Sequence, residues 1–221
     1  VIGDGIREIG DSAFRPCPSL ASVVIGNGVT NIGWDAFSDC TNLSSVAIGT
    51  NVAVIGDGAF AFCNSLIELT IPDSVRNVGG SAFQGCGGLA RVSMGAGVTN
   101  IGNSAFYQCT NLLNAPIGAG VASIGAYAFS GCTGMTNAVI PDRVTSIGDG
   151  AFGGGDVLAS VYCMGDAPAI GEALLFGGNE IASVYYLPYT SGWGETFGGR
   201  PTALWVPKIE AAGLGMEAGR F

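Results

Sequence analysis

The stretch Ile55–Asn77, IGDGAFAFCNSLIELTIPDSVRN, recurs along the chain with a constant length of 23 residues. Each copy keeps the pattern Ile-Gly-x-x-Ala-Phe-x-x-Cys-x-x-Leu-x-x-Val-x-Ile. The most regular column of this pattern is aromatic and contains Phe14, Phe37, Phe60, Phe83, Phe106, Phe129 and Phe152. A fixed period of this size is typical of a solenoid, in which each repeat is one turn of a superhelix and buries its apolar side against its neighbours. The sequence therefore predicts a repeat solenoid of 23-residue coils.

Within one coil, the segment Leu66–Ile71 alternates apolar and polar residues, as a half-buried β-strand does. A turn rich in Gly, Asn, Pro or Asp follows, and then a short extended piece such as Val98–Gly102. The Ser/Asp-x-Ala-Phe-x-x-Cys piece is too short for a stable helix and is expected to form one helical or 3-10 turn. We therefore expect one parallel strand ladder joined by short helical turns.

Two details of this ladder can be predicted. Glu68 and Arg91 occupy the same outward column on adjacent coils, so we expect them to form an exposed ion pair. Pro116 has no amide hydrogen and is expected to leave a gap in the ladder at its own coil.

The repeat sets the predicted domain boundaries. Residues 1–186 form the solenoid, with a partial first coil and about eight coils of 23 residues. The last two coils are irregular, because Gly155 fills the cysteine column and Phe176 arrives one residue late. Residues 187–207 are expected to form a C-terminal cap, since Trp193 and Trp205 supply apolar surface to cover the end of the stack.

Residues 208–221 match no column and are interpreted as a linker or the start of a downstream domain. The chain begins at Val1, inside a coil and without Met or a signal peptide, so we interpret it as a fragment of a longer protein.

Charge and hydropathy argue against nucleic acid and membranes as partners. The net charge is −9 and Lys208 is the single lysine, which disfavours nucleic acid and anionic lipid surfaces. Apolar residues recur in columns separated by polar residues and glycine. No run of 18 apolar residues is present to span a bilayer, and we expect no membrane insertion.

Six of the seven cysteines form a column of their own: Cys17, Cys40, Cys63, Cys86, Cys109 and Cys132. No CxxC motif or histidine accompanies them, so we expect neither a metal site nor a cofactor. Stacked coils place the column at about 5 Å spacing, which fits disulfides, but parallel side chains have poorly oriented Cβ vectors. Buried free thiols that act as small hydrophobic groups are the favoured interpretation, and disulfides remain the alternative.

Catalysis has little support in the sequence. The absence of histidine removes the usual general base and the Ser-His and Cys-His nucleophiles. The GxGxxG match at residues 148–153 consists of ordinary repeat positions with no long helix after it, so we do not expect dinucleotide binding. The turn aspartates Asp4, Asp73 and Asp142 skip coils, and turn chemistry explains them better than a calcium ladder. We expect no enzyme and no catalytic residue.

One surface feature indicates a ligand site. Tyr162 and Tyr185 occupy outward strand positions on successive coils, and Asn137, Ser160 and Ser183 occupy the neighbouring outward column. Exposed stacked aromatic rings bind sugar rings or the apolar side chains of a protein partner. These five residues are our candidate ligand-binding set. The alternative is that the cap folds over the two tyrosines.

The repeat pattern resembles the BspA-like leucine-rich repeats of bacterial surface antigens, over residues 1–186. The match fixes about ten columns in register, although Gly26 and Gly95 stand where the family has proline. The resemblance implies a right-handed leucine-rich-repeat superhelix, an extracellular or cell-surface location, and adhesion-type binding of a protein or glycan. It supplies no catalytic residues. We predict a non-enzymatic binding module, with a structural spacer that has no ligand of its own as the alternative.

Overall fold

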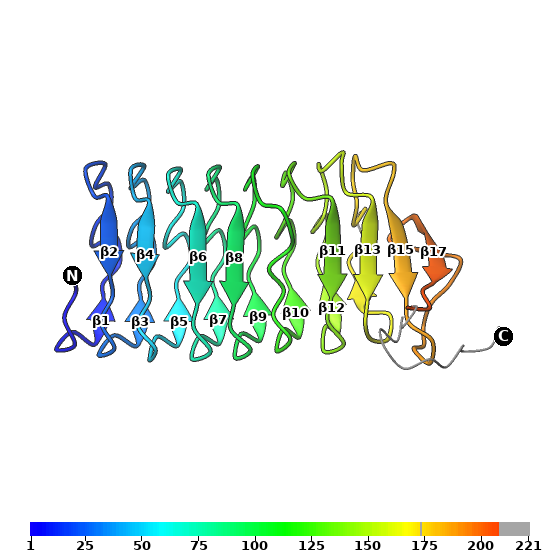
Figure 1. Ribbon diagram of the computed structural model, residues 1–221, viewed down its shortest axis with the longest axis horizontal. Helices are drawn as coiled ribbons and strands as arrows, with labels where there is room; N and C mark the ends of the chain where they lie inside the picture. Colours follow the sequence, from blue (N-terminus) through cyan, green and yellow to red (C-terminus); the bar gives the residue numbers. More distant parts are fainter. Residues whose placement is uncertain (173, 208–221) are drawn as a thin grey trace, which may run out of the picture.

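The computed structural model describes residues 1–172 and 174–207, and every regular element in this part of the chain is a β-strand. About eight coils are stacked side by side along the long axis, with the strands running across that axis (Figure 1). Each regular coil contributes one longer strand to one face and one two-residue strand to another. The predicted repeat solenoid is confirmed.

The two-residue strands build a continuous parallel sheet along the stack. It contains β1 (Glu8–Ile9), β3 (Asn31–Ile32), β5 (Val54–Ile55), β7 (Asn77–Val78), β9 (Asn100–Ile101), β10 (Ser123–Ile124), β12 (Ser146–Ile147) and β14 (Ala169–Ile170). Paired residues are 23 positions apart, as in Ile32 with Ile55. The expectation of a single ladder was therefore wrong, because the short extended piece of each coil is also a hydrogen-bonded strand.

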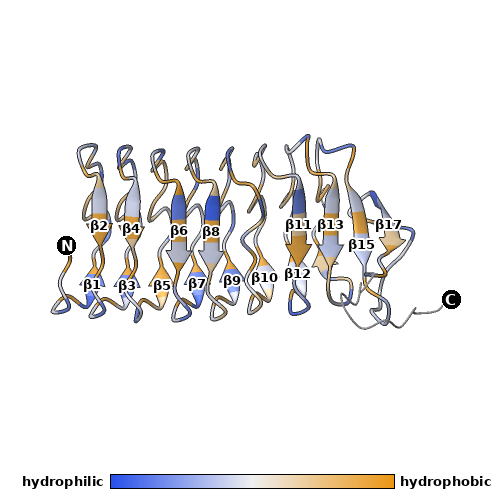
Figure 2. Cartoon of the chain, in the orientation of Figure 1, coloured by the Kyte–Doolittle hydropathy of each residue, from blue (hydrophilic) through white to orange (hydrophobic). Residues whose placement is uncertain are grey.

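The longer strands form what we call the strand face. In chain order they are β2 (Ser22–Val24), β4 (Ser45–Ala47), β6 (Glu68–Ile71), β8 (Arg91–Met94), β11 (Asn137–Ile140), β13 (Ser160–Cys163) and β15 (Ser183–Tyr186). Figure 2 shows that β6, β8 and β11 begin with hydrophilic residues.

The strand face is divided into three sheets, β2-β4, β6-β8 and one that begins with β11-β13-β15. The gap predicted at Pro116 is confirmed, since that coil keeps only one isolated bridge, from Asn114 to Asn137. The separation between β4 and β6 was not predicted, and the spacing of 23 residues between Ala47 and Thr70 gives no sign of it.

The Ser/Asp-x-Ala-Phe-x-x-Cys pieces form consecutive turns, and the expectation of a helical or 3-10 turn was wrong. In the third coil, the amides of Ala59 and Ala61 donate within the coil, to Gly56 and Gly58. The amides of Phe60 and Phe62 donate to the next coil instead. Because alternate N–H groups leave the coil, no helical run develops. We call the outward side of these stacked turns the turn face.

Aromatic rings fill the centre of the stack. Adjacent rings from Phe14 to Phe152 have centroids 4.9–5.6 Å apart, and Phe176 continues the stack at 6.0 Å from Phe152. The late arrival of Phe176 is thus absorbed by the backbone. Interior packing of this kind supplies most of the favourable free energy of a solenoid.

The seven cysteines are free thiols. The column makes a contact that the sequence did not suggest: each thiol from Cys40 to Cys132 donates to a phenylalanine carbonyl of the preceding coil. Cys86, for example, donates to Phe60 with an Sγ–O distance of 3.1 Å. The same carbonyl also accepts the amide of Cys63 within its own coil. The thiols therefore act as donors between coils as well as small apolar groups.

Turn aspartates also serve the neighbouring coil. The carboxylate of Asp4 accepts the amide of Asn27 at 2.7 Å, and that of Asp73 accepts the amide of Ala96 at 2.8 Å. In a second column the acceptors stand in every second coil: the side-chain oxygens of Asp11, Asp57 and Asn103 accept the amides of Trp34, Gly80 and Ala126. Each of these side chains accepts a backbone amide of the coil that follows. The acceptors thus have a structural role even though they do not occur in every coil.

The end of the described chain completes the strand face. β16 (Thr196–Phe197) and β17 (Arg200–Leu204) form an antiparallel hairpin, and β17 pairs in parallel with β15. The boundaries proposed for the cap remain predictions, and the predicted linker at 208–221 lies outside the described residues. The expected ion pair between Glu68 and Arg91 is confirmed at 2.8 Å, with both side chains exposed.

Candidate functional site

The structure brings the five predicted ligand-binding residues together on the strand face. Asn137, Ser160 and Ser183 are paired in register across β11, β13 and β15, and Tyr162 is paired with Tyr185 two residues further along. All five side chains are partly exposed. The period of two along each strand places the serine and tyrosine columns on the same outward side.

The two tyrosine rings are stacked, with centroids 5.3 Å apart and planes inclined by 20°. Trp205 follows β17, and its ring lies 4.9 Å from that of Tyr162 at an angle of 54°. A ligand-binding role for the tyrosines stays a prediction, and the predicted covering by the cap is only partial. The end segment contacts one tyrosine, while both tyrosines keep exposed surface. Tyr162, Tyr185 and Trp205 form what we call the aromatic cluster.

Other aromatic residues near in sequence lie elsewhere. Tyr186 is the next residue along β15, so its side chain points to the opposite side of the sheet. There it stacks on Trp193 at 5.3 Å, and Trp193 contacts Phe197 at 5.1 Å. Tyr189 is fully exposed in the following turn. Tyr186, Trp193 and Phe197 close the apolar interior, and neither they nor Tyr189 extend the aromatic cluster.

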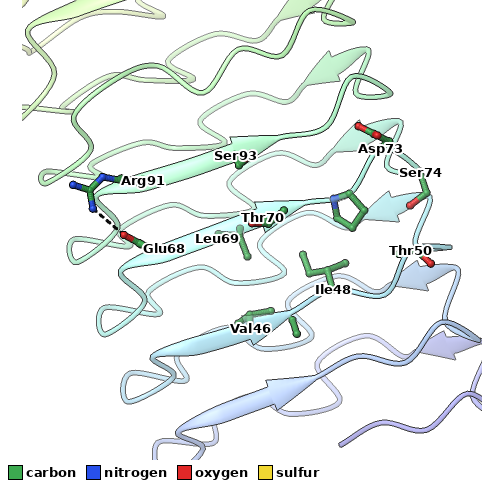
Figure 3. A pocket seen from close by; sticks show the side chains of 12 residues that line it. Val46, Ile48, Thr50, Glu68, Leu69, Thr70, Asp73, Ser74, Arg91 and Ser93 are labelled. Atoms are coloured by element: carbon green, nitrogen blue, oxygen red, sulfur yellow. Dashed lines mark hydrogen bonds and ion pairs between the residues drawn. The ribbon is translucent and has the colours of Figure 1, made fainter.

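A cleft lies on the same face, where β4 and β6 separate (Figure 3). Its volume is about 840 Å³. Val46 and Ile48 are only partly buried there, whereas Val23 and Ile25, their equivalents one coil earlier, are buried. The separation of the strands thus uncovers two inward-facing side chains.

Polar groups border this apolar floor. The Glu68–Arg91 ion pair lies at one end of the cleft, and Asp73 and Ser74 lie at the other (Figure 3). The hydroxyl of Thr70 lies between them. An apolar floor with a few polar groups and a volume in the range of small-molecule sites can accept a side chain of a partner or a small ligand. No sequence signal marked this cleft.

The buried thiols are unreactive. Burial raises the pKa of Cys86, Cys132 and Cys163 to about 12, and it also raises the pKa of Cys109 well above its ordinary value. A thiol with so high a pKa carries almost no thiolate near neutral pH and is a poor nucleophile.

A metal cluster and a membrane span are both absent from residues 1–172 and 174–207. No group of three or more His, Cys, Asp or Glu side chains lies close enough together to hold a metal ion. No helix there is long and apolar enough to cross a bilayer.

The stacked 23-residue coils and the leucine column define the chain as a leucine-rich-repeat solenoid. Residues 1–113 and 99–188 match the family model described as BspA type leucine rich repeat region (6 copies). The chain therefore belongs to the BspA-type leucine-rich repeat family. No curated protein sequence matches it.

Solved structures of bacterial proteins resemble the chain. A leucine-rich repeat protein of T. pallidum is 30% identical with a TM-score of 0.63, and the match covers 67% of this chain and 70% of that one. A leucine-rich cell surface protein of Faecalibacterium prausnitzii is 29% identical with a TM-score of 0.60. That match covers 83% of this chain and 59% of the other, so this chain spans little more than half the length of that protein.

Proposed function

We propose that this chain is a non-enzymatic, adhesion-type module of a bacterial surface or secreted protein, and that it binds a protein or glycan on its strand face. The observation that carries the proposal is the aromatic cluster of Tyr162, Tyr185 and Trp205. These rings gather at one end of a face whose other outward positions are mostly small, among them Ser22 and Ser45.

The geometry of the aromatic cluster suits recognition. Its rings combine a large apolar area with polar tips, and such residues dominate the energy of many interfaces. The tyrosines sit on hydrogen-bonded strands, so little conformational entropy is lost when a ligand orders them. Ser160 and Ser183 add hydroxyl groups beside the rings, and Asn137 adds an amide. The cleft between β4 and β6 offers a second contact on the same face for a long ligand.

The location is argued from relatives. The family match covers most of the chain, and the similar protein of F. prausnitzii is described as a cell surface protein. The absence of catalysis is argued from chemistry. The sequence has no histidine, and the thiols with raised pKa values are buried hydrogen-bond donors or apolar groups.

The test is binding of the chain to an array of glycans and extracellular-matrix proteins, beside a Tyr162→Ala/Tyr185→Ala variant. We expect at least one ligand, with binding reduced tenfold or more in the variant. The matched control is Ser22→Ala/Ser45→Ala, two outward positions at the far end of the strand face. Equal binding by both variants would place the site elsewhere, and circular dichroism establishes that each variant is folded.

One observation favours the alternative function of a structural spacer. Most outward positions of β2, β4, β6 and β8 are small or mildly polar, and such a face offers few anchor residues. A spacer predicts no binding anywhere on the array, together with a separate binding or catalytic domain in the full-length protein.

A further inference from the structure

A second candidate site lies on the turn face, away from the aromatic cluster. A depression of about 410 Å³ crosses the turns of the first five coils. Gly58, Ala61 and Gly80 contribute small residues to its lining, and two aromatic side chains, Trp34 and Phe62, border it. Trp34 is 56% exposed and Phe62 is 39% exposed. The strand-face proposal does not use any of these residues.

Trp34 and Phe62 are exceptions in their columns. The column of Trp34 otherwise contains Asp11, Asp57, Gly80, Asn103, Ala126 and Asp149. The column of Phe62 otherwise contains Pro16, Asp39, Gly85, Gln108, Gly131 and Gly154. Neither side chain is needed for the interior, because Phe37 and Phe60 already fill the ring stack of the same two coils. The fold therefore gives no reason for large aromatic residues at these two positions.

The backbone at Phe62 strengthens this point. Its φ is +61°, in the left-handed region that bulky residues rarely adopt and that other coils occupy with Gly, Asp or Gln. The next coil has Gly85 at the same position, and a Cβ there would lie 2.6 Å from Cδ1 of Phe62. The ring thus lies against the glycine backbone as a fixed platform. Strained residues held in place by their surroundings are frequent at binding sites.

Fixed hydrogen-bond acceptors surround the two rings. Asp35 is buried, and its carboxylate accepts a hydrogen bond from the Arg15 guanidinium, which also donates to Asp39 at 3.2 Å. Asp57 accepts the amide of Gly80 at 2.6 Å. Each carboxylate keeps further lone pairs for a ligand. The polar lining also includes Gln84, Asn103, Ser81 and Ser104.

This combination defines the ligand by its chemistry. Asp35 and Asp39 pair with the Arg15 guanidinium, and Asp57 adds a third carboxylate to this region without a second cation in the lining, so the local charge is negative and an anionic ligand is disfavoured. Aromatic faces accept the C–H side of a flat ring, and carboxylates and amides accept hydrogen bonds from hydroxyl groups. We infer that the depression between Trp34 and Phe62 binds a neutral carbohydrate, with one sugar ring against an aromatic face and its hydroxyls donating to Asp35 and Asp57. The volume fits a short oligosaccharide segment.

The test uses saturation-transfer NMR and calorimetry with four neutral oligosaccharides: cellopentaose, maltopentaose, xylopentaose and mannopentaose. An oligogalacturonate and hexalysine are the charged comparisons. We expect at least one neutral oligosaccharide to bind and the oligogalacturonate not to bind. Trp34→Ala is expected to weaken that binding tenfold or more.

Phe62→Gly is the most informative variant, because glycine is the residue that other coils use at this left-handed position. It is expected to keep or raise the melting temperature while weakening binding of the oligosaccharide tenfold or more. The matched control, Tyr127→Gly, removes an exposed ring from another left-handed turn position outside the depression and is expected to leave this binding unchanged.

Three outcomes would overturn the inference: no neutral oligosaccharide binds, binding is unchanged in Trp34→Ala and Phe62→Gly, or only hexalysine binds. The last would show that the carboxylates and rings select cations. Because the strand-face variant and the turn-face variants are measured separately, the failure of either proposal is distinguishable from failure of the other.

Discussion

The regular coils, residues 33–148, and the C-terminal coils, residues 149–186, share one aromatic interior but differ in the column beside it. In the regular coils every cysteine of the column donates its thiol hydrogen to a carbonyl of the preceding coil. In the C-terminal coils Gly155 and Asn179 take the place of cysteine, three residues after their phenylalanines. Asn179 is completely buried, and neither polar atom of its amide has a partner among the described residues.

The comparison shows that ring packing and hydrogen bonds respond differently to a shift of one residue. Ring packing has little directional demand, so Phe176 still stacks on Phe152 although it arrives one residue late and is inclined by 24°. A hydrogen bond depends on distance and angle, and the thiol ladder does not continue through the shifted coil. Apolar packing therefore keeps the coils stacked where the repeat becomes irregular. The hydrogen bonds between coils form only where the 23-residue register is kept.

The largest expected effect is alkaline unfolding of the regular coils. Burial raises the pKa of Cys63, Cys86, Cys109 and Cys132, so these thiols bind their protons more tightly in the folded chain than in the unfolded one. Their contribution to stability is then constant below pH 9 and decreases above it, by up to about tenfold in the folded-to-unfolded ratio per pH unit for each thiol. Circular dichroism from pH 7 to 11.5 is expected to show unfolding that begins above pH 9.

The control for this prediction is a Cys86→Ala/Cys109→Ala variant. Its urea midpoint is lower at pH 7 because two packing groups are reduced, but its midpoint is expected to decrease less steeply with pH than that of the wild type. An equal slope in both proteins would contradict the role of these thiols and assign the alkaline transition to other groups.

A second, smaller effect compares two rings of the stack. Phe83 lies between two rings at 5.6 and 5.2 Å, whereas Phe176 has one ring neighbour at 6.0 Å. We expect Phe83→Ala to lower the free energy of unfolding by about 4 kcal/mol and Phe176→Ala by about 3 kcal/mol, because both leave a cavity but the second removes fewer ring contacts. Urea denaturation of both variants checks this order, and a larger loss for Phe176→Ala would reverse it.

The smallest expected effect comes from replacing Asn179, which stands where the regular coils have cysteine. Replacing Asn179 by cysteine removes a buried amide without partners and supplies a thiol of the kind used in the regular coils. We expect Asn179→Cys to raise the free energy of unfolding by about 1–2 kcal/mol, measured by urea denaturation. Asn179→Ala removes the amide without adding a donor and is expected to give part of this gain. Destabilisation by both substitutions would mean that the amide is hydrogen-bonded, for example to a buried water.

Much of the fold could be predicted because the same position is seen in many repeats. A position that is apolar in nearly all of them is expected to be buried. The Phe, Leu and Cys columns are apolar at one phase of a fixed period, which is sufficient to predict the solenoid and its interior. The gap at Pro116 could be predicted because proline has no amide hydrogen to donate. The tyrosines could be placed on the outward side by the period of two along a strand. Their contact with Trp205 could not, because it depends on how the hairpin of β16 and β17 folds back.

Other features depend on hydrogen bonds between coils, which leave no mark in the periodicity. The second ladder was missed because two-residue strands are too short for an alternation to be visible. The pattern predicts helical turns because it does not show that alternate amides donate to the next coil. The separation of β4 from β6 and the left-handed backbone of Phe62 are local departures inside a perfect 23-residue spacing.

The direction of the ladders has a mechanical consequence. The hydrogen bonds between coils run along the long axis, because the strands lie across it (Figure 1). Tension on the two ends of the chain therefore opens these bonds a few at a time and peels coils from an end, instead of shearing a whole sheet at once. A stacked coil advances the chain by about 5 Å, the spacing of neighbouring strands, whereas 23 extended residues span about 75 Å. Each released coil lengthens the molecule by about 70 Å, which makes the stack an extensible tether that gives way one coil at a time.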